Sequence, residues 1–337
     1  MCPLSDADTA PTDPRLLAER VTEAVDTTWH RSTAAMSRIE IPLSVVAGLA
    51  LITTDGTDGT DGEKLSHIGP AAAVLRSRPD GELIAVLRGL WAFYLNQRPD
   101  LIARAYPLCS GCSRPEIDPR IRDAAAATAR AALDAGQLQL TGTDLRHEVD
   151  LLGVVLTHLR SNLTHLRSNS ARTGHGQFHT PADVATAMTA LLSIDECRTA
   201  DGTVDSTAVY EPAARYTGGL LRAAAQAMRR AGRHPATVVW SAVDIDELAI
   251  ACLAVNAHLW NLGPNVLLGV GDALADDWRT RAEGERTECL QLAQQIRRFK
   301  AMRQLLDPAA SSSSRFPGPA GRAAPRTRDN AVDSLAR

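Results

Sequence analysis

The sequence predicts an α/β protein in which a helical region precedes a small parallel sheet. From residue 64 to residue 150 apolar side chains recur at helical spacing, as in Leu83–Leu95 and the alanine-rich Arg120–Ala135. Between Ala208 and Asp272 short apolar runs rich in β-branched and aromatic residues alternate with helical stretches. That βαβαβ order favours parallel strands joined by right-handed crossovers.

The chain begins with a polar, proline-bearing segment, residues 1–14, which we expect to be disordered. Helical spacing follows over Leu16–Met36 and continues as described above, so we predict a helical N-terminal domain over residues 15–150. The heptapeptide Leu156–Asn162 is then repeated at once as residues 163–169. Seven residues are close to two helical turns, so a helix can absorb the insertion. A coiled-coil seam and a tandem duplication in the coding DNA both explain it, and two heptads favour the duplication.

The second region, residues 151–282, has the alternating pattern. We expect strands at Ala208–Tyr210, Thr237–Val243 and Val266–Val270, and helices at Leu220–Ala231 and Glu247–Trp260. No strand pattern returns after Asp272, so the sheet is expected to be incomplete. Residues 283–306 have helical spacing, and residues 307–337, rich in Pro, Ser, Ala and Arg, indicate a disordered basic tail.

Composition excludes several classes of function. The net charge is −3 and aromatic residues make up 4%, which disfavours a protein that coats nucleic acid by charge or by base stacking. The six cysteines lack regular spacing and indicate reduced thiols. Cys109 and Cys112 have the spacing of half a zinc site but no matching second pair, so we expect no metal. The longest apolar run, Ile41–Ile52, is too short to span a bilayer, so we expect a soluble, cytoplasmic protein without a membrane partner.

Acidic residues follow each predicted strand, at the edge where open α/β sheets bind ligands: Glu211, Asp244 and Asp272. Asp244 is placed to accept hydrogen bonds from ribose hydroxyls, and Asp272 from an exocyclic amino group of adenine. Taken singly, each acid is equally well explained as a helix cap. Gly218 and Gly219 can adopt positive φ angles and let the backbone approach a cofactor closely.

Taken in order, these segments resemble the N6-adenine-specific DNA methyltransferases, in particular the modification subunits of type I restriction-modification systems and related actinobacterial proteins. The resemblance covers roughly residues 140–275. It is carried by the following segments: Asp150-Leu-Leu-Gly153, Gly176-Gln-Phe-His-Thr-Pro181, Glu211-Pro-Ala213 with Thr217-Gly-Gly219, Asp244-Ile-Asp246, and Gly271-Asp272-Ala273.

The resemblance implies a class I S-adenosylmethionine-dependent methyltransferase fold, a Rossmann-like sheet that is only partial here. It implies methyl transfer from S-adenosyl-L-methionine to the N6 atom of adenine in DNA, with sequence specificity supplied by a separate subunit. It also implies the following cofactor-binding residues: Phe178, Thr180, Pro181, Glu211, Pro212, Ala213, Thr217, Gly218, Asp244, Ile245 and Asp272.

Three departures from the family pattern bear on activity. Arg215-Tyr216 occupies the place of a glycine in the turn, and His179 is an extra residue before Thr180. The catalytic Asn/Asp-Pro-Pro-aromatic tetrad is absent from the sequence, so the catalytic residues stay unassigned. We therefore expect a weak or inactive methyltransferase. The alternatives are a non-catalytic interaction or cofactor-binding module of a DNA-modification assembly, completed by another protein at the open sheet edge, and a truncated or frame-shifted gene product.

Overall fold

The structure, a computed structural model, describes residues 13–32, 38–53, 61–113, 118–166, 180–192, 208–212, 217–274 and 277–306. The predictions made for Phe178, His179, Ala213 and Arg215-Tyr216 lie outside these ranges, as do those for most of residues 1–14 and for residues 307–337. The chain divides into two compact units, Met1–Ala293 and Gln294–Arg337. Of the second unit the structure describes residues 294–306, which are helical.

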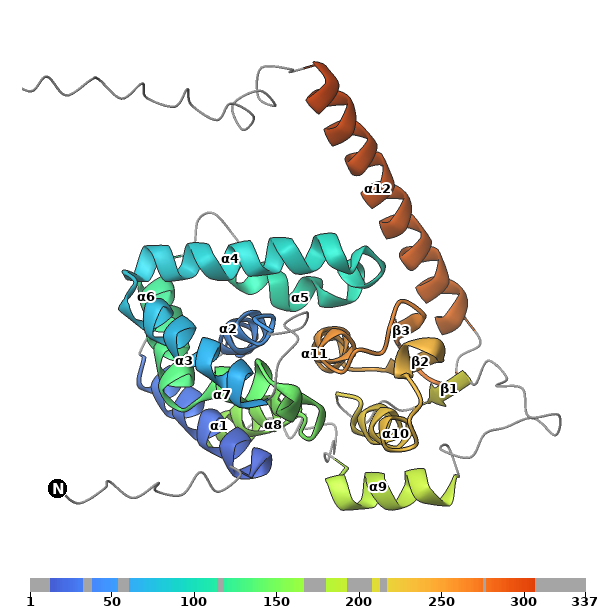
Figure 1. Cartoon of the computed structure of the whole chain (residues 1–337), viewed down its shortest axis with the longest axis horizontal. Helices are drawn as coiled ribbons and strands as arrows, with labels where there is room; N and C mark the ends of the chain where they lie inside the picture. The colour runs from blue at the N-terminus through green and yellow to red at the C-terminus, as the bar shows by residue number, and fades with distance from the viewer. Residues whose placement is uncertain are drawn as a thin grey trace, which may run out of the picture. The chain divides into compact units, whose positions relative to one another are not determined.

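Helices form the first part of the described chain (Figure 1). The α-helices before the sheet are α1 (Pro14–Arg31), α2 (Glu40–Ala50), α3 (Asp61–Ser77), α4 (Asp80–Gln97), α5 (Ile102–Ser113), α6 (Pro119–Asp134), α7 (Gln137–Thr141), α8 (Leu151–Leu166) and α9 (Ala182–Leu191). Short 3-10 helices are η1 (Pro99–Leu101), η2 (Asp144–His147) and, within the sheet region, η3 (Pro235–Thr237). The predicted helical region is therefore confirmed.

Two of these helices begin with the same Asp-Pro pair. The carboxylates of Asp13 and Asp118 each accept a hydrogen bond of 2.8 Å from a backbone N–H of the first turn, and a proline follows each acid. An N-cap acid satisfies an N–H group that has no partner within the helix, and proline at the first position loses none. For this reason α1 begins at Pro14. The prediction that this helix runs to Met36 was too long, because Ser32 is extended and ends it.

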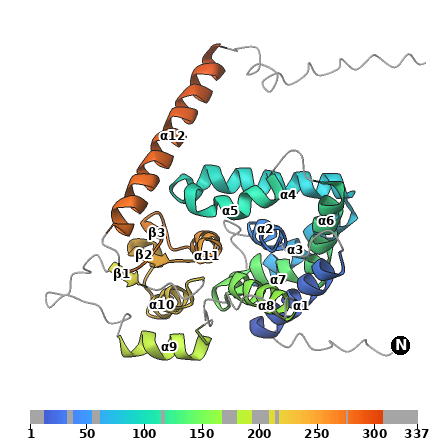
Figure 2. The same cartoon turned by 180° about the vertical axis from the view of Figure 1, so that it is seen from behind.

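The sheet contains three parallel strands in the order β1-β2-β3: β1 (Ala208–Glu211), β2 (Val239–Asp244) and β3 (Val266–Val270). The connecting helices are α10 (Gly219–Arg230) and α11 (Glu247–Leu259), as Figures 1 and 2 show from opposite sides. These elements confirm the predicted βαβαβ order, but β2 begins at Val239 and not at the predicted Thr237. That residue belongs to η3 and not to the second strand.

The two faces of the sheet enter different cores. Trp240, Ala242 and Leu268 belong to the main core, together with buried residues of α11. Val243, one position further along β2, contacts a second small core with Trp278 and Ala282. This alternation follows from the strand period of two residues. The sheet is thus covered on one face by the α11 layer and on the other by the start of the last helix.

The main core crosses the domain boundary predicted at residue 150. It contains Leu87 of α4, Leu152 of α8 and Leu253 of α11, all buried. Helix α11 packs against α5 and α8 as well as against the sheet. The helical region and the sheet therefore belong to one unit and share the main core, because the face of α11 turned away from the strands needs apolar cover. No helix in the described ranges is long and apolar enough to cross a membrane.

The last helix, α12 (Trp278–Leu306), starts earlier than the predicted residue 283. Its first residue is buried against β3, where a Cβ on Gly269 would lie 2.5 Å from Trp278 Cε3. The Trp278 ring also stacks on Tyr210 of β1, with centroids 5.7 Å apart and planes inclined by 7°. The first turn of α12 thus packs on the sheet, whereas the sequence predicted a helix over residues 283–306 that is separate from the sheet region.

Candidate functional site

The three predicted acids lie at the carboxyl edge of the sheet but differ in burial. Glu211 ends β1 and is only 3% exposed, whereas Asp244 at the end of β2 is half-buried and Asp272 after β3 is exposed. The backbone carbonyl of Asp244 accepts a hydrogen bond of 2.9 Å from the N–H of Gly271, which ties the ends of β2 and β3 together. The edge is therefore formed as the strand pattern predicts.

Asp244 and Asp246 are neighbouring acids, and only one of them is a helix cap. Asp246, not Asp244, caps α11: its Oδ1 accepts hydrogen bonds from the N–H groups of Leu248 at 3.0 Å and Ala249 at 3.2 Å. Asp244 Oδ1 accepts from the N–H of Asp246 at 2.9 Å and thereby holds the loop that leaves β2. Ile245, between them, is exposed. The predicted contact of Asp244 with ribose hydroxyls stays a prediction.

Asp272 has a local role in the structure. Its Oδ1 accepts a hydrogen bond of 2.9 Å from the N–H of Leu274, two residues further on. Aspartate commonly stabilises a turn in this way. The predicted contact of Asp272 with an adenine amino group stays a prediction.

The two glycines after β1 behave differently. Gly218 has φ +85°, as predicted, and stands immediately before α10. A Cβ on Gly218 would overlap Leu253 of α11, so its missing side chain admits a neighbouring helix and not a cofactor. Gly219 is the first residue of α10 and does not have a positive φ. A Cβ on Gly219 would meet only the Thr180 carbonyl oxygen, at 4.0 Å. The open approach is therefore at Gly219.

Thr180 lies beside Gly219, at the start of the segment that leads into α9. Thr180 as a whole is 8% exposed, and no described residue forms a hydrogen bond with its hydroxyl. Pro181 precedes α9 and is exposed, and Pro212 is exposed directly after β1. The structure thus brings together Thr180 and the start of α10, two segments that the sequence places far apart.

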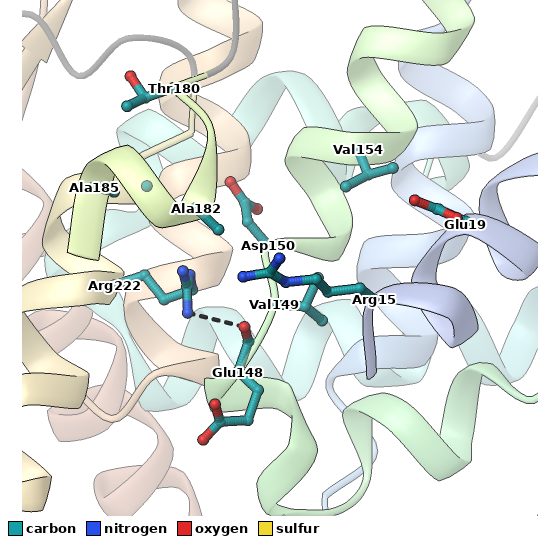
Figure 3. A pocket seen from close by; sticks show the side chains of 11 residues that line it. Arg15, Glu19, Glu148, Val149, Asp150, Val154, Thr180, Ala182, Ala185 and Arg222 are labelled. Atoms are coloured by element: carbon teal, nitrogen blue, oxygen red, sulfur yellow. Dashed lines mark hydrogen bonds between the residues drawn. The ribbon is translucent and has the colours of Figure 1, made fainter. Parts of the chain in front are cut away.

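These two segments line a cavity of about 200 Å³ together with Asp150, Arg222 of α10 and Arg15 of α1 (Figure 3). Glu211, Asp244 and Asp272 are not among its described lining residues. Pockets for whole cofactors usually measure about 300–1,000 Å³. The cavity therefore has room for one end of a nucleoside cofactor, and the strand-end acids lie outside it.

Arg222 is the main buried cation of this cavity. Its Nη1 donates to the carbonyl oxygens of Glu148 at 2.9 Å and of His147 at 3.3 Å. Burial lowers the pKa of its guanidinium, and the charges of Asp150 and Glu148 oppose that shift. Arg222 therefore binds the segment before α8 to α10 and places a positive charge at the cavity wall.

Thr217 makes a buried contact that the sequence did not predict. Its side chain is fully buried, and its hydroxyl donates a hydrogen bond to Asp150 Oδ2. Asp150 Oδ1 accepts a second hydrogen bond, of 2.8 Å, from Nδ2 of Asn256. Sequence reasoning identified Asp150 only as the first residue of a family segment and missed Asn256. The hydroxyl of Thr217 is thus committed inside the protein, which disfavours it as a cofactor ligand.

Comparison with known proteins gives little more. No protein-family model matches the sequence, and no curated protein matches it. A similar solved structure is the type I restriction-modification system methyltransferase subunit from Streptococcus thermophilus, which is 17% identical with a TM-score of 0.39. The alignment covers 80% of this chain and 61% of that subunit, so the chain spans less than two thirds of its length. A likeness this remote assigns no activity to the chain.

Proposed function

We propose that the chain is a methyltransferase-like protein that binds S-adenosyl-L-methionine and acts in DNA adenine methylation. The observation that carries the proposal is the meeting of Thr180 with Gly219 at the start of α10. The Thr180 carbonyl oxygen lies 4.0 Å from where a Cβ of Gly219 would stand, so no side chain blocks the helix start, and Thr180 also carries a buried hydroxyl without a described partner. A helix N-terminus offers N–H donors and a positive dipole to an anionic group. The carboxylate at the methionine end of the cofactor has that chemistry.

The other predicted residues support the nucleoside end. Asp244 is half-buried at the carboxyl edge of β2, where an acid accepts hydrogen bonds from ribose hydroxyls. Glu211 is a buried acid at the end of the neighbouring strand. When bound, the cofactor supplies the activated methyl group. The residues of this chain bind and orient it, while Thr217 supports the turn.

Methyl transfer needs more than cofactor binding. A flipped adenine must be held by acceptors for its amino group and by an aromatic ring, which is the role of the tetrad that this sequence lacks. Positioning of this kind supplies a large part of the rate enhancement. We therefore propose that this chain alone binds the cofactor and transfers methyl groups weakly or not at all, and that a specificity subunit or a complementing protein is its partner on DNA.

Isothermal titration of the full chain with S-adenosylmethionine and S-adenosylhomocysteine tests the proposal. We expect both ligands to bind. Asp244→Ala should lower the affinity about tenfold, the size expected for the loss of hydrogen bonds to a charged group. Asp123→Ala, an exposed acid of α6, is the matched control and should bind as the wild type does. Absence of binding to the wild-type chain would contradict the proposal. Transfer of labelled methyl to adenine-containing duplex DNA, lost in Asp244→Ala, would show that the chain is an active enzyme.

A non-catalytic interaction module is the second candidate, and the open side of β1 favours it. Among the described residues β1 pairs with β2 only. Tyr210 and Val239 expose apolar surface on these two strands, and an unpaired strand edge attracts further strands. A chain that binds no cofactor but forms a stable complex with a DNA-modification subunit would support this candidate over the first.

A further inference from the structure

The family-like segment Asp150-Leu-Leu-Gly153 has no part in the proposed chemistry, yet the carboxylate of Asp150 accepts three hydrogen bonds from three different segments. Asp150 is 4% exposed and stands immediately before α8. Its Oδ1 accepts hydrogen bonds from the N–H of Gly153 at 2.9 Å and from Asn256 Nδ2 at 2.8 Å, and its Oδ2 accepts one from the hydroxyl of Thr217. One buried carboxylate therefore joins α8, α11 and the turn that leads into α10.

The contacts around this carboxylate leave no room for a side chain at position 153. A Cβ on Gly153 would overlap Asp150 Oδ2, and it would lie 2.5 Å from Thr217 Oγ1. Glycine is thus required three residues after the acid, which explains the spacing of the segment. Asn256 Nδ2 also donates to the backbone carbonyl of Thr217 at 3.2 Å. Both the side chain and the backbone of Thr217 are held from the same cluster.

The residue after Thr217 has a left-handed backbone conformation, which glycine adopts readily. Gly218 has φ +85° and lies against Leu253 of α11. Its carbonyl oxygen accepts the hydrogen bond of 3.0 Å from the N–H of Arg222 that closes the first turn of α10. Fixing Thr217 therefore fixes where α10 begins. That first turn lines the cavity with Gly219 and Arg222.

We infer that Asp150 is a positioning residue, which holds the Thr217–Gly218 turn and thereby sets the start of α10 at the cofactor site. The identity of the ligand rests on the proposed function, whereas the positioning of the turn does not. The helical region thereby has a task in the site, because the residue before α8 fixes a turn that lies 67 positions away in the sequence.

Hydrogen–deuterium exchange of the full chain measures the positioning without a ligand. Thr217→Val removes the hydroxyl that Asp150 accepts from, and Thr217→Ser restores it. We expect the amides of residues 217–222 to exchange about tenfold faster in the valine variant and at the wild-type rate in the serine variant, because a lost hydrogen bond to a buried carboxylate is worth about that factor. Thr128→Val in α6 removes an equally buried threonine hydroxyl, bonded to the Ala124 carbonyl at 2.8 Å, and is the matched control.

Two ligands separate positioning from a general loss of stability. Well below the unfolding temperature, Thr217→Val should weaken the binding of S-adenosylhomocysteine by about tenfold. It should weaken the binding of adenosine by less than about twofold, because adenosine has no amino-acid end that could contact α10. Two results would overturn the inference: unchanged exchange at residues 217–222 in Thr217→Val, or equally faster exchange of the same residues in Thr128→Val. If the wild-type chain binds no S-adenosylhomocysteine, the proposed function fails, and the exchange rates alone decide the positioning role.

Discussion

The hydroxyl of Tyr94 in α4 donates a hydrogen bond of 2.8 Å to the backbone carbonyl of Ala254 in α11. Both residues are buried, and the Tyr94 ring meets Trp91 and His258 edge to face, with centroids 5.8 Å and 5.6 Å away. This contact joins the helical region to the layer that covers the sheet. It adds a hydrogen bond to the apolar packing through which the two regions share the main core.

Tyr94→Phe should lower the free energy of unfolding by about 1 kcal/mol at pH 7, because it removes one buried hydrogen bond and keeps the ring. Urea unfolding followed by circular dichroism measures the change. Tyr106→Phe is the matched control, since Tyr106 is exposed and its hydroxyl should contribute little. Equal effects of the two substitutions would show that the contact with Ala254 adds no stability.

The same tyrosine gives the protein an alkaline limit. Burial raises the pKa of Tyr94 above its ordinary value of 10.0. In the unfolded chain the group ionises near pH 10, while in the folded chain it keeps its proton. Stability therefore falls as the pH rises above about 10, because the unfolded state loses the proton first. The difference in unfolding free energy between wild type and Tyr94→Phe should shrink over that range, and a constant difference from pH 8 to pH 11 would contradict this expectation.

Two glycines with similar backbone angles allow strain to be separated from packing. Gly218 has φ +85° and Gly232 has φ +72°, but a Cβ on Gly218 would overlap Leu253, whereas one on Gly232 would have nothing within 4 Å. Alanine costs about 1–2 kcal/mol in the left-handed conformation alone. Gly232→Ala should cost that much, and Gly218→Ala should cost about 1–3 kcal/mol more because of overpacking. Thermal unfolding of both variants checks the order, and a larger loss in Gly232→Ala would refute it.

Local patterns in the sequence predict the elements of the sheet region well. The strand over Val266–Val270 and the helix that starts at Glu247 were predicted at the observed positions, and the positive φ of Gly218 was anticipated. These features depend on neighbours in the chain. The role of Asp150 was not predictable in the same way, because its bond to Asn256 joins positions 106 residues apart. The start of α12 was missed for a related reason, since Trp278 owes its place to packing on Gly269.

The N-cap of α11 should make stability depend on acid pH. Asp246 pairs with Arg160 of α8 and accepts two backbone hydrogen bonds. Burial alone would raise the pKa of Asp246, but Arg160 and the N–H groups of Leu248 and Ala249 together bring it below the ordinary 3.8. The stabilisation is therefore present above about pH 4 and is lost as the pH falls through the lowered folded-state pKa.

Two substitutions at this position separate charge from capping. Asp246→Asn keeps a good N-cap but loses the charge, so its deficit at pH 7 should disappear near pH 2. Asp246→Ala loses the cap as well and should cost about 1 kcal/mol more at either pH. Urea unfolding at pH 7 and at pH 2 measures both deficits. A deficit of Asp246→Asn that is as large at pH 2 as at pH 7 would exclude a contribution of the charge.

The stack of Trp278 on Tyr210 should make the first turn of α12 necessary for the sheet. Trp278 is the largest member of the small core on the second face, and it is buried against Gly269. Trp278→Ala should lower the free energy of unfolding by about 3–5 kcal/mol, the usual cost of deleting a large buried aromatic side chain. Trp278→Phe keeps an aromatic ring and should retain most of the stability.

Phe299→Ala is the control, because Phe299 is an exposed aromatic residue of the same helix, and it should change stability little. Urea unfolding compares the three variants, and a loss in Trp278→Ala no larger than in Phe299→Ala would show that the sheet does not depend on this turn.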